Sequence, residues 1–226
     1  MTTFVSYLGG SAGDMFTASC NGIDLTDTDG FRHRKIITAS NKVYTIKHQD
    51  NCIRSGEISL DKAIADVPFE FVSTHLFNEL CDNKVLNIIV HDKQVLDRII
   101  QRQMWLQRLT LKKDDGNIAT YVYNLCLAKQ FINASKFWFA FSKKIAIDRM
   151  ADKIQSQRYQ KLDFSKLFTN DFVGSLNDQH FTTNTGILEL NHNAWIQRQP
   201  LLSDNDVIDS ICEKFITYKW SNNDRI

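Results

Sequence analysis

Three closely spaced glycines near the N-terminus form the first pattern in this sequence that could support chemistry. Gly9, Gly10 and Gly13 fall within five positions, although the whole chain has only nine glycines. The apolar run before them predicts a short strand, and the run that starts at Met15 predicts a helix. A strand, a glycine turn and a helix start direct backbone N–H groups and the positive end of the helix dipole to one point, which suits a phosphate or sulfate.

We therefore expect this turn to bind an anion. The residues expected to contact the anion are Gly9, Gly10, Ser11, Ala12, Gly13 and Asp14. Asp14 stands where a phosphate-binding loop would carry lysine, and the glycine spacing of dinucleotide-binding sites is absent. These departures argue against an NTP-driven motor, a standard kinase and a dinucleotide-dependent enzyme. The alternative is an ordinary strand-to-helix turn in which Asp14 caps the helix.

A histidine at the end of another predicted strand is the second candidate. His75 closely follows the strand predicted over residues 69–73. The carboxyl ends of strands converge on the ligand crevice of open α/β sheets, so we expect His75 to face the same crevice as the glycine turn. A neutral imidazole there could accept a proton from a hydroxyl group as a general base. The alternative is a histidine that only packs or caps at the junction.

Two arginines one helical turn apart are the third candidate. Arg98 and Arg102 lie on the helix predicted after Asp92, and because they are four positions apart they share one face. Two guanidinium groups on one face could hold a phosphate. Lys93, at the start of the same helix, is a further candidate. The alternative is a basic face in contact with solvent.

Composition narrows the possible classes of protein. The chain has 226 residues, of which 43% are hydrophobic, with a formal net charge of +1 and a pI near 7.7. It can bury a sizeable core, and its charge gives no general attraction to nucleic acid or membrane. Five widely spaced cysteines without a C-x-x-C pair predict a reducing compartment and no metal site. Because the sequence shows neither a leader pattern nor a run of about 18 apolar residues, we expect a cytoplasmic protein.

The order of the predicted elements indicates an α/β fold. Strands over residues 69–73 and 85–90 flank a short helical segment over residues 75–81, and this βαβ rhythm requires a parallel sheet. We expect a P-loop-like three-layer fold with a central, mostly parallel sheet and a helical second half. Other predicted elements are edge strands over 35–39 and 42–47, a helix capped by Ser59, helices over 118–132 and 135–158, a strand over 162–168, a loop over 182–186 and a closing helix over 203–215.

The whole chain, residues 1–226, is expected to form a single domain. Residues 1–109 would be its anion- and nucleotide-binding half, and residues 110–226 its mainly helical half. The helix over residues 135–158 carries aromatic residues at 137, 138, 139 and 141, which face all sides of a helix. We expect this helix to be deeply buried, and the alternative is a surface that binds a protein partner.

The order and spacing of these pieces resemble the sulfotransferases that use 3′-phosphoadenosine-5′-phosphosulfate (PAPS), including uncharacterised sulfotransferase-like proteins of tailed phages. The run from Tyr7 to Gly13 occupies the place of the family's Tyr-Pro-Lys-Ser-Gly-Thr-Thr loop. Ser73-Thr74-His75-Leu76 matches three residues of the family's Lys-Thr-His-Leu-Pro run. The loop lysine is missing here, and the arginine and serine that bind the 3′-phosphate are replaced by His91 and Ile99.

This resemblance implies transfer of a sulfuryl group from PAPS to a hydroxyl or amine acceptor. It implies that the amides of Gly10–Gly13 and the Ser11 hydroxyl hold the 5′-phosphosulfate, and that His75 is the catalytic base. Arg98 or Arg102 would replace the missing arginine. The lysines that could replace the missing loop lysine are Lys42, Lys47 and Lys93.

Two other functions stay open at this point. A nucleotide-dependent phosphotransferase would need Mg²⁺, for which Asp14 or Asp92 is available. A non-catalytic viral or phage protein could retain the fold and bind a partner through the aromatic helix over residues 135–158. The missing lysine and arginine favour this second alternative.

Overall fold

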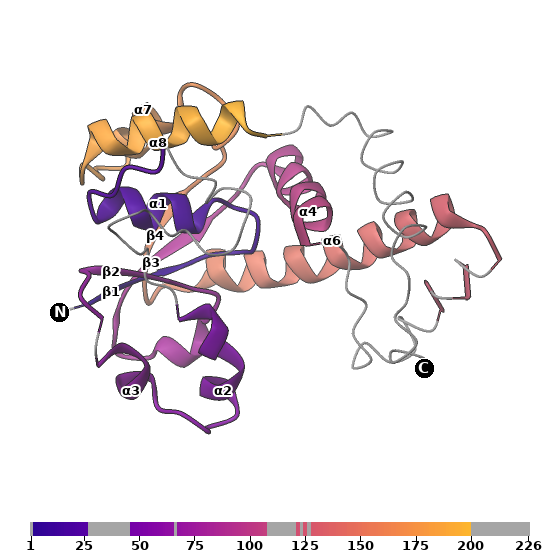
Figure 1. Ribbon diagram of the computed structural model, residues 1–226, viewed down its shortest axis with the longest axis horizontal. Coiled ribbons are helices and arrows are strands. Elements are labelled where there is room, and N and C mark those ends of the chain that lie inside the picture. Colours follow the sequence, from indigo (N-terminus) through magenta and orange to yellow (C-terminus); the bar gives the residue numbers. More distant parts are fainter. Residues whose placement is uncertain are drawn as a thin grey trace. The chain divides into compact units, whose positions relative to one another are not determined.

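The computed structural model describes residues 2–26, 46–65, 67–107, 121–122, 124–125 and 128–199, without the side chains of residues 48, 104–107 and 131. The chain forms two compact units, one of residues 1–96 and 149–199 and the other containing residues 97–148 (Figure 1). The predicted strand over 35–39, most of that over 42–47, Lys42 and the closing helix over 203–215 lie outside the described residues.

A parallel four-stranded sheet forms the centre of the first unit. Its strands are β1 (Thr3–Ser6), β2 (Phe71–Thr74), β3 (Lys84–Ile89) and β4 (Gln160–Asp163), in the order β2-β1-β3-β4. Each neighbouring pair is parallel. All four residues of β1 are buried, as expected for a central strand covered on both faces. The α/β class and the parallel sheet predicted from the sequence are therefore confirmed.

Helices cover both faces of this sheet (Figure 1). One layer contains α1 (Gly13–Cys20), α7 (Phe172–Asp178) and α8 (Thr185–Gln197). The other contains α2 (Asp50–Arg54), α3 (Leu60–Ile64) and the short 3₁₀ helix η3 (Asn78–Leu80). Ser59 accepts a hydrogen bond from the Lys62 amide, so the predicted cap of α3 is confirmed.

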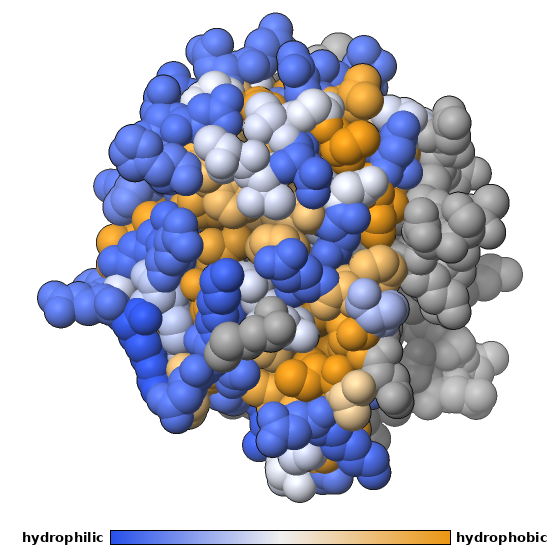
Figure 2. Space-filling model, turned by 90° about the vertical axis from the view of Figure 1, so that its left-hand side faces the viewer, coloured by the Kyte–Doolittle hydropathy of each residue, from blue (hydrophilic) through white to orange (hydrophobic). Residues whose placement is uncertain are grey.

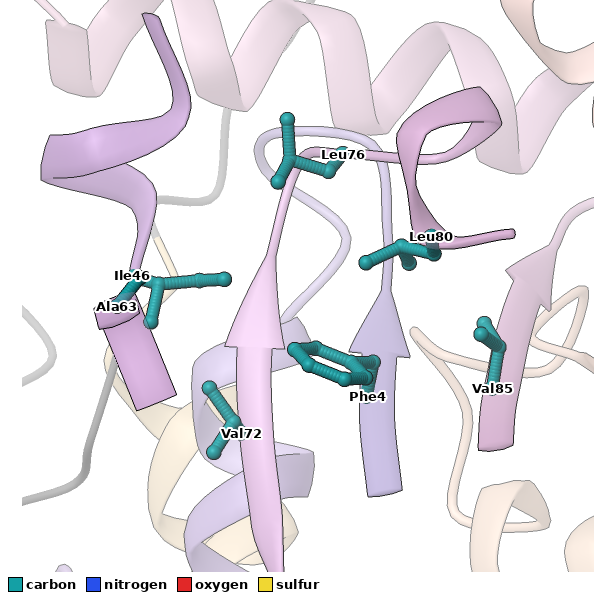
Figure 3. Packing of buried hydrophobic residues seen from close by; sticks show 7 residues of the cluster. All are labelled: Phe4, Ile46, Ala63, Val72, Leu76, Leu80 and Val85. Carbon is teal, nitrogen blue, oxygen red and sulfur yellow. The ribbon is translucent and has the colours of Figure 1, made fainter. Parts of the chain in front are cut away.

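The core between the sheet and α3 is built around Phe4 (Figure 3). Phe4 lies between Val72 and Val85, which are its register partners on β2 and β3. These side chains point to one face because parallel partners share the same pleat. The remaining buried members of the cluster are Ile46, Ala63, Leu76 and Leu80.

Helix α8 was not expected from the sequence. A loop was predicted over residues 182–186, but α8 begins at Thr185 and runs to Gln197. Its buried residues Leu188, Asn191, His192 and Trp195 follow helical spacing, although two of them are polar. Because two of the buried positions are polar, the pattern of hydrophobic residues did not indicate this helix.

Two long helices extend into the second unit, α4 (Lys93–Gln107) and α6 (Phe131–Gln155). The Asp92 carboxylate accepts hydrogen bonds from the Gln94 and Val95 amides at 2.8 and 3.0 Å, so Asp92 caps α4 as predicted. Lys143 donates to Asp97 at 2.6 Å and connects the two helices.

The expected deep burial of the aromatic run on α6 is wrong. Phe137 is 37% exposed, and Trp138, Phe139 and Phe141 are only partly buried. Consecutive positions distribute around a helix, so a helix with one covered face leaves some of them near solvent.

The molecular surface is mixed in character. Figure 2 shows one face on which hydrophobic residues reach the surface between hydrophilic ones. Scattered apolar residues of this kind are normal on a protein surface. Among the described helices, none is both long and apolar enough to cross a membrane.

Two glycines of the N-terminal turn are required by the fold itself. Gly10 has a φ of 89°, in the left-handed region that favours glycine. A Cβ atom on Gly13 would lie 2.1 Å from Cγ of Tyr7, whose ring is buried. The Tyr7 ring therefore occupies the space that any side chain at position 13 would need.

We predict that Gly13→Ala lowers the free energy of unfolding by roughly 1–3 kcal/mol, because the new methyl group overlaps a buried ring. The matched control is Gly174→Ala on the exposed side of α7, where an added Cβ meets nothing within 4 Å. This control should raise stability by up to about 1 kcal/mol, as expected for alanine in a helix. Urea denaturation measures both changes, and equal effects would contradict the packing of Tyr7 on Gly13.

Candidate functional site

His75 and the glycine turn lie at the same edge of the sheet. Ser6 and Thr74 end β1 and β2 and are partners in the parallel register. Tyr7 and His75 are the next residues of the two segments, and their rings pack with centroids 4.6 Å apart. The predicted proximity of His75 to the turn after β1 is therefore found in the structure.

The imidazole of His75 is held by the backbone of β1. Its Nδ1 atom lies 3.1 Å from the Tyr7 carbonyl oxygen. A carbonyl oxygen can only accept a hydrogen bond, so Nδ1 carries the proton and Nε2 keeps its lone pair when the ring is neutral. Burial, assisted by the nearby charge of Lys47, lowers the pKa of His75 to about 4. His75 is therefore a neutral base at pH 7.

Helix α2 fixes the main chain around His75. Asp50, which is 4% exposed, accepts from the Thr74 hydroxyl at 3.0 Å and from the His75 amide at 3.1 Å. The Thr74 hydroxyl also accepts from the Leu76 amide at 3.0 Å. The position of the imidazole is thus set by contacts from β1, β2 and α2, which is the kind of support a functional base requires.

We predict that NMR titration of histidine ring nitrogens finds His75 neutral, with its proton on Nδ1, down to about pH 5. The physical reason is the loss of hydration of the charged ring, which lowers its pKa to about 4. A midpoint near 6.5 would show that the ring keeps its hydration, and a proton on Nε2 in the neutral ring would show that it is not held on the Tyr7 carbonyl.

Asp14 is part of an internal network and does not cap α1. Its Oδ1 accepts from the Tyr7 hydroxyl at 2.7 Å and from the Ser73 hydroxyl at 2.8 Å, and its Oδ2 pairs with Lys47. Lys47 also donates to the Tyr7 hydroxyl at 2.6 Å. Burial acts to raise the pKa of Asp14, but the charge and hydrogen bonds of these partners hold it below its ordinary value. The Asp14 carboxylate is therefore ionised and neutralised by Lys47.

The N-terminus of α1 presents backbone donors at this edge. Ala12 is the N-cap in the left-handed conformation, and the first helical hydrogen bond runs from Phe16 N to Ala12 O at 3.0 Å. Among the residues that the structure describes, none accepts a hydrogen bond from the amides of Gly13, Asp14 or Met15. The amide and the hydroxyl of Ser11 both donate to the Leu8 carbonyl, so this hydroxyl is engaged within the turn.

The other candidate cations and carboxylates have the following places in the structure. Arg98 and Arg102 belong to the second unit, on α4, and their role in anion binding stays a prediction. Lys93 is exposed at the start of α4. The carboxylates proposed for Mg²⁺ have protein partners, since Asp14 pairs with Lys47 and Asp92 caps α4. Within the described ranges, no three His, Cys, Asp or Glu side chains gather in a way that could hold a metal ion.

Lys153 is the group at this edge that the sequence analysis missed. It is 4% exposed, and its Nζ donates to Ser6 Oγ at 2.6 Å and to Asn87 Oδ1 at 2.8 Å. None of the ion pairs between described residues includes Lys153. Burial lowers its pKa from 10.5 to about 7. The sequence could have indicated that Lys153 is buried, because Ala146, Met150 and Lys153 lie at helical spacing on one face of α6 and the first two are apolar.

We predict that Lys153 makes stability depend on pH. The folded protein releases the Lys153 proton near pH 7, whereas an unfolded lysine keeps it to about pH 10.5. Between pH 7 and 10.5 the unfolded state therefore binds more protons than the folded state. The contribution of Lys153 to the free energy of unfolding rises with pH in this range and is lost as the pH falls toward 7. The unfolding free energy of the wild type relative to Lys153→Met should increase by about 2 kcal/mol between pH 7 and 9.

Urea denaturation at several pH values measures this difference. Subtracting the Lys153→Met curve removes the contributions of other titrating groups. A difference that does not change with pH would mean that Lys153 keeps an ordinary pKa. Lys161→Met is the matched control, since Lys161 is partly buried nearby and donates to the Ile154 carbonyl.

The comparisons with known proteins give no match: no protein-family model, no curated protein and no solved structure matches this chain.

Proposed function

We propose that this chain is a sulfotransferase-like protein with a P-loop-like site, and that it transfers a sulfuryl group from PAPS to a hydroxyl or amine acceptor. The observation that carries the proposal is the state of His75. Its Nδ1 is held by the Tyr7 carbonyl, and its Nε2 keeps a lone pair beside the turn that leads into α1. A fixed, neutral imidazole next to the N-terminus of a helix suits proton removal beside a bound anion.

The residues at this edge fit an anionic donor in two ways. The amides of Gly13, Asp14 and Met15 form no hydrogen bond with any described residue, and they lie at the positive end of the α1 dipole. Lys47 neutralises the one carboxylate of the turn, Asp14, so the negative charge of a donor meets no uncompensated carboxylate there. PAPS, when bound, would supply the activated sulfuryl group.

His75 acts on the acceptor in this proposal. Its Nε2 takes the proton of the acceptor hydroxyl while that oxygen forms a bond to sulfur. The bond between sulfur and the donor's 5′-phosphate oxygen breaks, and its electron pair stays on the phosphate. Adenosine 3′,5′-bisphosphate leaves, and the proton passes from His75 to water. The backbone amides at the start of α1 stabilise the charge that develops on the leaving phosphate.

A non-catalytic role is the second candidate function. The packing of the Tyr7 ring on Gly13 favours it, because this packing explains Gly13 without a ligand. The network of Asp14, Lys47 and Ser73 likewise has internal partners. The two candidates differ in whether the chain binds an adenosine bisphosphate.

We predict that the wild-type protein binds adenosine 3′,5′-bisphosphate in isothermal titration calorimetry. His75→Asn should bind it within about threefold, because the asparagine amide replaces the Nδ1 donor. Transfer from ³⁵S-labelled PAPS to a panel of phenols, alcohols and amines should fall by about 10²–10⁴-fold in this variant, since the base is lost.

The matched control is His180→Asn, which changes an exposed histidine of left-handed conformation, where asparagine is well tolerated. It should leave binding and transfer unchanged. Full transfer activity in His75→Asn would exclude His75 as the base. Failure of the wild type to bind the bisphosphate would reject the sulfotransferase proposal and support the non-catalytic role.

A further inference from the structure

We propose that Lys153 forms an oxyanion-binding position, together with Ser6, and that this position takes a phosphate or sulfate group of the ligand. The proposal rests on the proposed function in that it assigns this group to the same donor. It differs from the sequence-based expectations, which placed the missing positive charge on Lys42, Lys47 or Lys93.

Lys153 lies at a place in the sheet where ligands commonly bind. Its partners Ser6 and Asn87 are register partners on β1 and β3. In the order β2-β1-β3-β4 the chain first crosses from β1 to β2 and then passes to the opposite side of β1. The point between β1 and β3 is therefore the topological switch point, and ligands of open α/β sheets bind at the carboxyl ends of the strands there.

Lys153 is buried without a carboxylate among its described partners. A buried ammonium group requires compensation, and buried lysines are normally paired with a carboxylate. The described partners of Lys153 are neutral: a hydroxyl, an amide oxygen and the face of the Phe77 ring, whose centroid lies 4.6 Å from Nζ. The described contacts of Nζ therefore include no carboxylate, and an external anion could supply the compensation that the buried ammonium lacks.

Lys153 is connected to His75 through neighbouring residues. Ser6, which binds Lys153, directly precedes Tyr7, whose carbonyl binds His75. The Ser6 hydroxyl also donates to the Leu76 carbonyl at 2.5 Å, next to His75 in sequence. The positive charge of Lys153 contributes to the lowered pKa of His75. Lys153 is therefore close enough to affect the pKa of His75, and so would be an anion bound at Lys153.

The ring of Phe77 lies against the proposed position. It is half-buried, with its centroid 4.6 Å from Lys153 Nζ, and it packs edge-on against Tyr159 with centroids 5.6 Å apart. An oxyanion that pairs with Nζ would take the place of this cation–π contact.

The test uses the full-length protein with ¹³C-labelled lysine, and it follows the Lys153 side chain by NMR from pH 5 to 10. Titrations are made without anion, with sodium sulfate, and with adenosine 3′,5′-bisphosphate. We expect the bisphosphate to move the Lys153 midpoint upward by at least one pH unit. In calorimetry, Lys153→Met should weaken bisphosphate binding at least tenfold, Lys153→Arg less, and the control Lys161→Met less than twofold.

The possible results separate this inference from the proposed function. Bisphosphate binding that leaves the Lys153 midpoint and the affinity of Lys153→Met unchanged would overturn the inference and keep the proposed function. No bisphosphate binding, with sulfate still raising the midpoint, would support the oxyanion position and reject the sulfotransferase proposal. A Lys153 midpoint that neither anion moves would overturn the inference. This midpoint is measured on the wild-type protein, so misfolding of a variant cannot produce that result.

Discussion

The pairing of β1 with both β2 and β3 in one parallel sheet determines the whole candidate site. Ser6 is the partner of Thr74 on one side and of Asn87 on the other, so the ends of three strands meet at one edge. His75 follows β2 and is held by Tyr7, while Lys153 reaches β1 and β3 through Ser6 and Asn87. A change in this register would separate the imidazole from the ammonium, because each is bound to a residue at the end of β1.

Burial, more than direct charge pairing, sets the chemistry of this edge. It lowers the pKa of His75 to about 4 and that of Lys153 to about 7, in each case because a charged form loses its hydration. Asp14 is partly buried, and Lys47 keeps it ionised. The edge also contains Asp50, a buried carboxylate that accepts from the Thr74 hydroxyl and the His75 amide, and burial raises the pKa of Asp50. The groups at this edge that favour an external anion are the backbone amides at the start of α1 and the amine of Lys153.

The glycine turn has a double role in this structure. Gly10 permits a positive φ, and Gly13 admits the ring of Tyr7. Both glycines are thus required by local geometry, and the spacing that predicted an anion site is also the spacing that this packing requires. The amides at the start of α1 still lie at the edge of the sheet, so the argument for an anion comes from these donors and from His75 and Lys153.

Short-range sequence patterns were enough to predict many of the local elements and the position of His75 beside the turn after β1. The strand before the turn, the helix after it, the cap at Ser59 and the βαβ rhythm all follow from short-range patterns, and the structure confirms them. Helix α8 was missed because Asn191 and His192 occupy buried positions, where they bond to Ser19 and Leu167 and so satisfy their polar groups. That compensation comes from residues distant in sequence.

The arrangement of the charges could not be predicted from the sequence, because it depends on how distant segments fold together. Asp14 was expected to contact the anion, or alternatively to cap a helix or bind Mg²⁺, but its partners Lys47 and Ser73 are far along the chain. Lys153 is separated from Ser6 by 147 positions, so no local pattern could connect them. Sequence patterns report the period of a helix or strand, whereas the pKa and the partner of a side chain depend on burial, which is fixed only when distant segments pack together.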